Sequence, residues 1–270
     1  MRSSLVVCAI LISAVIAAIS MTSCHGGGAP VQPQSTLFRD PALEQVVADA
    51  LGKDPASITV QDLATLVDLS TPPGPNRNIC DLEGLQYCVN LEELTLRATG
   101  IIDLSPISGL SKLSVLNLSG CLSLSDIGPL AKLTNLSELN LDGATFVENL
   151  TPLSQLTRLR KLRFAYTLIY SLQPLATLGG LTELDVSYSS NLKDISALAW
   201  LSNLAALNLT QCRAVTDFTP IANLARLTIL YIGDNGITDI SFYPGSPNSA
   251  SLAWTSTRSA TSLLSPDYIN

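Results

Sequence analysis

LSVLNLSGCLSLSDIGPLAKLTN, residues 113–135, is the stretch that decides the fold. The four residues from Leu116 to Ser119 alternate apolar and polar side chains, as a short β-strand with one buried face requires. The two leucines of this segment therefore point inward, and its asparagine and serine point outward. A polar residue shortly before Pro129 then favours a short helical turn, because proline in the first helical turn gives up only a backbone donor that has no partner.

The same unit recurs at a fixed period along the chain. Segments that open with LxxLxL or a close variant are spaced by 22 or 23 residues, and they start at Leu91, Leu113, Leu136, Leu159, Leu181, Leu204 and Leu227. Seven copies in register are the signature of a leucine-rich repeat. Because no single repeat can bury its own leucines, neighbouring repeats must stack and share one core. The sequence therefore predicts an α/β solenoid with a curved parallel sheet on one side and 3₁₀ helices, short helices or turns on the other.

The segments on either side of the repeats differ from them in pattern. Residues 40–52 have Asp40 as a helix N-cap, Pro41 at the first helical position, apolar residues at helical spacing and Gly52 as a stop. A second short helix is expected to start at Thr59. We therefore predict, in order, a helical N-terminal cap at 38–70, an insertion loop and cap junction at 71–90, the repeats at 91–240, and an irregular C-terminal cap or tail at 241–270.

The N-terminus has the layout of an export signal. One positive charge at Arg2 precedes mainly apolar residues from 5 to 19, a run that is short for a membrane span. The sequence MTSC that ends at Cys24 resembles the bacterial lipobox, whose cysteine becomes the acylated first residue of a mature lipoprotein. We expect a lipoprotein-type signal peptide at 1–23 with lipid attachment at Cys24. The alternative is cleavage near Ser20, which would release a secreted protein.

A tether follows that signal. Residues 24–37 are rich in glycine, proline and polar residues, a composition typical of a flexible linker. Such a linker would let a folded domain stand away from a membrane. The expected location is the cell envelope, with the protein exported and anchored to a bacterial membrane by lipid.

The composition limits the function. Charged residues make up 14% of the 270, and the formal net charge is −7, whereas a nucleic-acid binder would need a basic stripe. The single histidine, His25, lies in a glycine-rich stretch, which argues against histidine-dependent catalysis and metal binding. No CxxC spacing supports a zinc or redox site. We therefore expect no enzyme activity, no cofactor, no metal and no nucleic-acid partner.

From Phe38 to about Ser241 the chain resembles the internalin-like leucine-rich-repeat proteins of bacteria. The residues that carry the resemblance are FRDPALEQVVADALGKDPASITVQDLATL, ICDLEGLQYCVNL and the recurring elements DLSPI, DIGPL and DFTPI. The resemblance implies a right-handed horseshoe with a helical N-terminal cap and a concave face that binds another macromolecule. The sequence has no LPxTG motif, so adhesion to host cells is not carried over from the family.

The ninth position of each repeat departs from the asparagine ladder of this family. It holds Thr99, Cys121, Ala144, Thr167, Ser189, Cys212 and Asn235. The turn after each strand must therefore satisfy its backbone in another way. We expect the side chain of Cys121 to lie inside as a packing residue. Cys80 and Cys88 could form a disulfide, or Cys88 could be a buried free thiol.

The outward-facing residues of the strands supply the candidate contact site. Tyrosine and arginine are enriched in binding hot spots, and the candidates in the C-terminal half are Arg163, Tyr166, Asp185, Tyr188 and Tyr231. We predict a non-catalytic protein-binding module that uses this concave face at the bacterial cell envelope. The partner would be an unknown protein of the envelope or of a host surface. The alternatives are an adhesin or host-factor binder, or a structural envelope component without a specific ligand.

Overall fold

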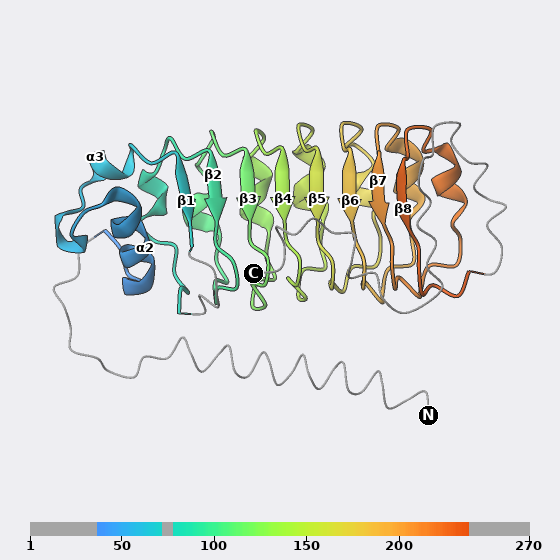
Figure 1. Ribbon diagram of the computed structural model, residues 1–270, viewed down its shortest axis with the longest axis horizontal. Helices are drawn as coiled ribbons and strands as arrows, with labels where there is room; N and C mark the ends of the chain where they lie inside the picture. Colours follow the sequence, from blue (N-terminus) through green and yellow to red (C-terminus); the bar gives the residue numbers. More distant parts are fainter. Residues whose placement is uncertain (1–36, 72–77, 238–270) are drawn as a thin grey trace, which may run out of the picture.

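The computed structural model describes residues 37–71 and 78–237 (Figure 1). Within these ranges, three-residue strands form one parallel eight-stranded sheet in chain order. The strands are β1 Asp68–Ser70, β2 Glu93–Thr95, β3 Val115–Asn117, β4 Glu138–Asn140, β5 Lys161–Arg163, β6 Glu183–Asp185, β7 Ala206–Asn208 and β8 Ile229–Tyr231. The predicted signal peptide, lipid site and C-terminal segment at 241–270, together with the tether up to residue 36, lie outside the described residues, as do residues 72–77 of the insertion loop.

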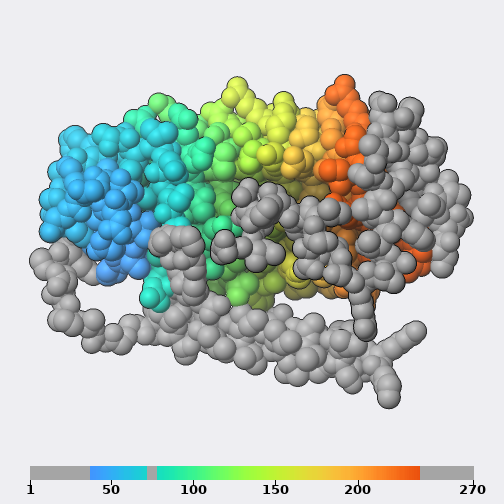
Figure 2. All heavy atoms as spheres, in the orientation of Figure 1, coloured from blue at the N-terminus to red at the C-terminus, as the bar shows by residue number. Residues whose placement is uncertain are grey.

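Short helices follow strands β2 to β7 and lie behind the sheet (Figure 1). They are η3 Ser105–Ile107, η4 Gly128–Lys132, η5 Thr151–Gln155, η6 Gln173–Leu175, η7 Ser196–Trp200 and η8 Thr219–Asn223, all of the 3₁₀ type. Before the repeats come α2 Pro41–Leu51, η1 Pro55–Ser57, α3 Val60–Leu63 and η2 Leu85–Tyr87. In Figure 2 the described residues form one elongated body from this helical cap to the last repeat. The architecture confirms the predicted leucine-rich-repeat solenoid.

The sheet contains one strand that the repeat count missed. β1 lies at the end of the segment assigned to the helical cap, and Leu69 pairs with Leu94 of β2. The segment reads LVDLST from residue 66, so Thr71 occupies the place of the last leucine of the motif and is buried there. This copy starts 25 residues before Leu91 because of the insertion between them. Both departures hid it from a search by motif and period.

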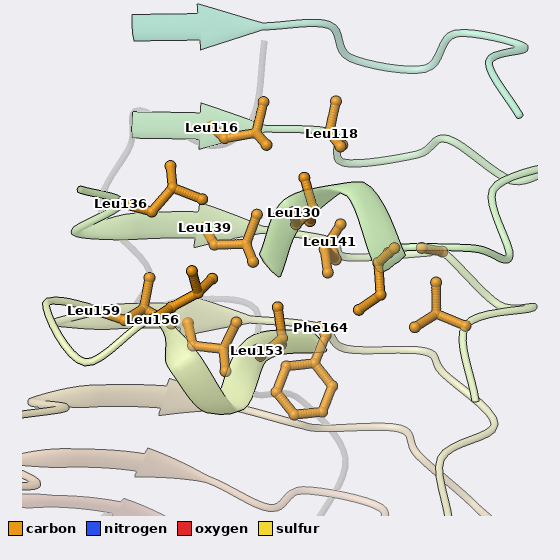
Figure 3. Packing of buried hydrophobic residues seen from close by; sticks show 14 of the residues in the cluster. Leu116, Leu118, Leu130, Leu136, Leu139, Leu141, Leu153, Leu156, Leu159 and Phe164 are labelled. Carbon is orange, nitrogen blue, oxygen red and sulfur yellow. The ribbon is translucent and has the colours of Figure 1, made fainter. Parts of the chain in front are cut away.

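The core is a stack of equivalent leucines between the sheet and the 3₁₀ helices (Figure 3). Leu116 pairs in register with Leu139 of the next strand, and both are buried. Leu130 of η4 and Leu153 of η5 cover them from the other side (Figure 3). Burying each such side chain contributes about 1.5–3 kcal/mol relative to leaving it exposed. The repeats are therefore held together mainly by the residues that make the motif recognisable.

Asp40 connects the helical cap to the first repeats. Its Oδ1 accepts hydrogen bonds from the backbone N–H groups of Ala42 and Leu43 at the start of α2, at 2.9 and 3.2 Å. Its Oδ2 accepts from the N–H groups of Cys80 and Asp81, at 2.6 and 3.2 Å. Because the carboxylate is only 7% exposed, it satisfies four backbone donors that water reaches poorly.

At the ninth repeat position short side chains replace asparagine in all repeats but the last, and all of them except Ala144 are polar. The Cys121 thiol donates to the Leu96 carbonyl at 3.2 Å, and the Cys212 thiol donates to the Val186 carbonyl at 3.2 Å. Asn235 makes the same kind of contact with the Leu209 carbonyl of the preceding repeat, at 2.8 Å. The carbonyls of Leu96, Val186 and Leu209 are therefore satisfied without a continuous asparagine column, and Cys121 lies inside as predicted.

The convex turns are capped by a column of polar residues that precedes the 3₁₀ helices. The carboxylates of Asp103, Asp194 and Asp217 each accept a hydrogen bond from the backbone N–H two residues further on. Hydrogen bonds from hydroxyl side chains, and to a lesser extent these backbone hydrogen bonds, hold the pKa of each carboxyl below its ordinary value. These aspartates therefore stabilise the turns by forming Asx-turns, as aspartate and asparagine do in other proteins.

Candidate functional site

The outward side of the sheet, here called the concave face, consists of the first and third residues of each strand. Among these sixteen positions of the described strands, five are carboxylates and two are cations. The carboxylates are Asp68, Glu93, Glu138, Glu183 and Asp185, and the cations are Lys161 and Arg163. Both cations lie on β5, where Lys161 forms an ion pair with Glu138 of β4 at 3.1 Å. The concave face is therefore acidic except for one basic strand in its middle.

Arg163 lies at the centre of a polar network on this face. Its Nε donates to Oδ2 of Asp142 at 2.9 Å, and its Nη2 is 3.5 Å from Oδ2 of Asp185. The Asp185 Oδ2 also accepts from Asn208 Nδ2 at 3.2 Å, and the Asp142 Oδ1 accepts from the Ala165 N–H at 2.8 Å. Burial raises the pKa of Asp142 although Arg163 opposes the shift. One guanidinium thus serves two carboxylates, which leaves the network with one net negative charge.

Two tyrosines stack beside this network. The ring centroids of Tyr166 and Tyr188 are 4.4 Å apart, and the ring planes differ by 7°. This separation is close to the spacing of neighbouring strands, about 4.8 Å. Each repeat therefore contributes one ring, and the ring planes lie roughly perpendicular to the direction in which the repeats stack. Tyr166 is 54% exposed and Tyr188 is 39% exposed. The pair therefore presents aromatic surface to solvent in a fixed orientation.

The backbone at both tyrosines is left-handed. The eighth position of each of the seven repeats from Leu91 onward has a positive φ, and its residues are Ala98, Gly120, Gly143, Tyr166, Tyr188, Gln211 and Asp234. Glycine forms this turn without strain, whereas a bulky side chain at φ 60° costs about 1–3 kcal/mol. Five of these seven repeats carry a non-glycine residue in this conformation, and in two neighbouring repeats that residue is a tyrosine. Strain of this kind is typical of functional sites.

The structure brings together four of the five predicted contact residues. Arg163 and Asp185 form an ion pair, and Tyr166 and Tyr188 stack next to them. Tyr231 lies on β8, two strands from β6, and its strand neighbour across the sheet is Asn208. Four of the predicted residues therefore lie together on β5, on β6 and on the turns that follow these strands. Tyr231 lies apart from them, on β8.

Sequence reasoning missed two members of the network. Asp142 follows β4 at the seventh repeat position and anchors Arg163, and Asn208 on β7 anchors Asp185. Asp142 could have been found, because the seventh position also points outward and Arg163 is the strand residue one repeat further on. The stacking of the two tyrosines was also open to prediction, since they share the eighth position in consecutive repeats.

Further apolar side chains are exposed on the turns that follow β4 and β5. Phe146, Leu168 and Tyr170 are all exposed, and Lys193 lies over the Tyr170 ring with its Nζ 5.4 Å from the centroid. Phe146 and Tyr170 thus add exposed aromatic surface, and Leu168 adds exposed aliphatic surface, on turns of the repeats that carry β4 and β5. Exposed aromatic surface beside charged side chains is a common property of protein-interaction sites.

Catalytic chemistry finds little support among the described residues. Within residues 37–71 and 78–237, no group of three His, Cys, Asp or Glu side chains could hold a metal ion. No helix in the same ranges is long and apolar enough to cross a membrane.

Cys88 is a free buried thiol, so it does not pair with Cys80. Burial raises the pKa of Cys88 and Cys212 to about 12 and also raises that of Cys121.

The buried cysteines should react slowly in the native protein. A thiol whose pKa lies far above neutral pH is almost entirely protonated, and alkylation requires the thiolate. Iodoacetamide at pH 7.5 should therefore label Cys121 and Cys212 at least ten times more slowly in the native protein than in urea-unfolded protein, as followed by peptide mass spectrometry. Equal rates in the two states would show that these side chains are not inside the repeats.

Two solved structures of Listeria monocytogenes proteins share this architecture. The internalin inlF matches with a TM-score of 0.67 and 30% sequence identity, over 80% of this chain and 69% of that one. Internalin C2 matches with a TM-score of 0.70 and 30% identity, over 82% of this chain and 97% of that one. No protein-family model matches the chain, and a search of curated proteins finds no match.

Proposed function

The chain belongs to the internalin-like leucine-rich-repeat proteins, and from this premise we propose that it is a non-catalytic protein-binding module whose concave face holds the partner. The observation that carries the proposal is the stack of Tyr166 and Tyr188 beside the network of Arg163. A few hot-spot residues supply most of the energy in protein interfaces; tyrosine and arginine are enriched among them, and they cluster near the centre of the contact. Here tyrosine and arginine lie together beside a regular concave face.

The rigidity of this surface supports the proposal. Arg163 is held by two carboxylates, each of which is anchored by a further hydrogen bond. The strands that carry these residues are fixed by the buried leucines behind them. A surface that is already ordered loses little conformational entropy when a partner binds, so more of the contact energy contributes to affinity.

Affinity capture with the full-length protein tests this function. A partner retained from an envelope extract should be released when Arg163, Tyr188 and Tyr231 are all replaced by alanine, with a loss in affinity of at least about thirtyfold, as expected for hot-spot residues. The matched control is Trp200→Ala, which removes a 70% exposed aromatic side chain from η7 on the convex side and should change nothing.

The separate variant Tyr231→Ala asks whether the contact extends to β8. If the triple variant retains the partner as well as the wild type does, binding through the concave face is wrong while the fold stands. If no protein is retained at all, a structural role in the envelope without a specific ligand becomes the better account.

We further propose that the protein is exported and anchored by lipid at Cys24, after removal of a signal peptide at 1–23. Support comes from the apolar run followed by MTSC and from the tether composition of the residues up to 37. In bacteria grown with labelled palmitate, the wild-type protein should incorporate the label and partition with membranes, and Cys24→Ser should do neither. Labelling of the serine variant would contradict the lipid site, and unlabelled wild-type protein in the medium would favour cleavage near Ser20.

A further inference from the structure

One face of the tyrosine stack is left open by the repeats next to it. Because the two rings stand one per repeat, the outer face of Tyr166 points toward the eighth position of the preceding repeat, which is Gly143. A Cβ built on Gly143 would meet no atom closer than 3.6 Å, an ordinary van der Waals contact, and because the residue is glycine no side chain at that position covers this face of the ring. The outer face of Tyr188 points instead toward Gln211, whose amide donates to Asp234 Oδ2 at 3.1 Å.

The stack is not needed to form the turn. Gly120 and Gly143 form the same left-handed turn with no side chain at all. Tyr166 therefore introduces backbone strain and leaves more than half of its surface in water, which gives little stability in return. A bound group on its open face would account for both features.

The negative charges around the open face of Tyr166 favour a positively charged group. Asp142 directly precedes Gly143, and together with Asp185 it shares the single guanidinium of Arg163. Burial raises the pKa of Tyr166 most, the neighbouring Tyr188 raises it further, and the negative charges of Asp185 and Asp142 add to the shift, so both carboxylates lie near this ring. The concave face as a whole carries five carboxylates against two cations. A neutral sugar or aromatic ring could stack here but would gain nothing from this charge.

We propose that the open face of Tyr166 above Gly143 binds an arginine side chain of the protein partner. A guanidinium is planar and cationic, so it can lie flat on the ring and extend the stack by one layer while it approaches the excess carboxylate charge. Lysine has the charge without the planar face, and a neutral planar group has the shape without the charge. This assignment rests on the proposed protein-binding function and names the chemistry of the contact.

Short peptides test the assignment without knowledge of the partner. The full-length protein is labelled with ¹³C in its seven tyrosine rings, and the Tyr166 signals are assigned by their loss in Tyr166→Phe. Acetyl-Gly-Arg-Gly-amide should shift the Tyr166 signals with an affinity about two to five times that of the peptides with lysine or with citrulline, the neutral planar analogue of arginine. The Tyr166→Phe variant should still bind the arginine peptide, because phenylalanine keeps the aromatic face. Shifts in the ¹³C signals of the remaining tyrosines measure that binding.

Two variants that preserve the turn complete the test. Tyr166→Gly copies the preceding repeats, so it should fold normally and lose the preference for arginine. Gly143→Asn keeps a residue that tolerates positive φ and places an amide where the guanidinium would lie, so binding of the arginine peptide should weaken severalfold.

Several outcomes would overturn the arginine site. Equal affinity for the arginine and citrulline peptides would rule out a charge-selective site, and equal affinity for arginine and lysine would rule out stacking. A larger shift with methyl-β-glucoside would indicate a carbohydrate site instead. If a captured partner still depends on Arg163 and Tyr188 while Gly143→Asn binds it normally, the protein-binding function stands and the arginine site is wrong.

Discussion

Asp40→Ala is expected to lower the free energy of unfolding by about 2–5 kcal/mol. The change removes the N-cap of α2, which costs about 0.5–2 kcal/mol on its own. It also leaves the partly buried N–H groups of Cys80 and Asp81 without their acceptor; an unsatisfied buried donor costs about 1–3 kcal/mol, and partial access of water lowers that cost at these two groups. Urea unfolding followed by circular dichroism measures the difference.

Asp54→Ala is the matched control for this experiment. Asp54 also caps a helix, but it accepts a single backbone bond, from Ala56 at 2.9 Å, in an exposed position before the three-residue η1. Its loss should cost no more than about 1 kcal/mol. Similar losses for the two variants would mean that Asp40 does not join the cap to the repeats and acts only at its own helix.

Leu116→Ala should also cost about 2–5 kcal/mol. The side chain is 1% exposed and lies between equivalent leucines of the neighbouring strands, so its removal leaves a cavity that the stacked repeats cannot fill without moving. Val115→Ala is the control on the same strand, because Val115 is an outward aliphatic residue that is only partly buried. We expect a loss below about 1 kcal/mol for Val115. Equal losses would show that the strand register is wrong.

Much of the fold could be predicted from the sequence because one period specifies it. The spacing of 22 or 23 residues identifies seven strands, and the alternation at Leu116 identifies the face that each side chain takes. β1 could not be found in this way, because Thr71 replaces a leucine and an insertion changes the spacing. A repeat search finds copies that obey the pattern and misses a copy that substitutes a buried residue of another kind.

The candidate site was less accessible to prediction. Repeat positions indicate which residues share a column, so Arg163 and Asp185 could be placed side by side. They do not indicate which carboxylate an arginine side chain will reach, and Arg163 pairs more closely with Asp142 than with Asp185. Long side chains choose among several neighbours within reach, and that choice depends on burial and local hydrogen bonds that a one-dimensional pattern does not contain.

Stability and the proposed binding function use different surfaces of the same repeat. The fourth and sixth positions bury leucine and carry the fold, whereas the third, fifth and eighth positions face outward and can vary. The strained tyrosines lie only at outward positions, so the buried stack is not disturbed by them. A repeat protein can therefore change its contact surface one repeat at a time while neighbouring repeats supply the stability.

Site-specific photo-crosslinking in living cells tests the proposed binding face most directly. A benzophenone amino acid is placed at position 188 in one variant and at position 200 in another, and irradiated cells are examined for covalent adducts. The two native residues, Tyr188 and Trp200, are both exposed aromatics, one beside the concave face and one on convex η7. We predict a discrete protein adduct at position 188 and none at position 200. Adducts of equal yield at both positions, or at position 200 alone, would contradict binding through the concave face.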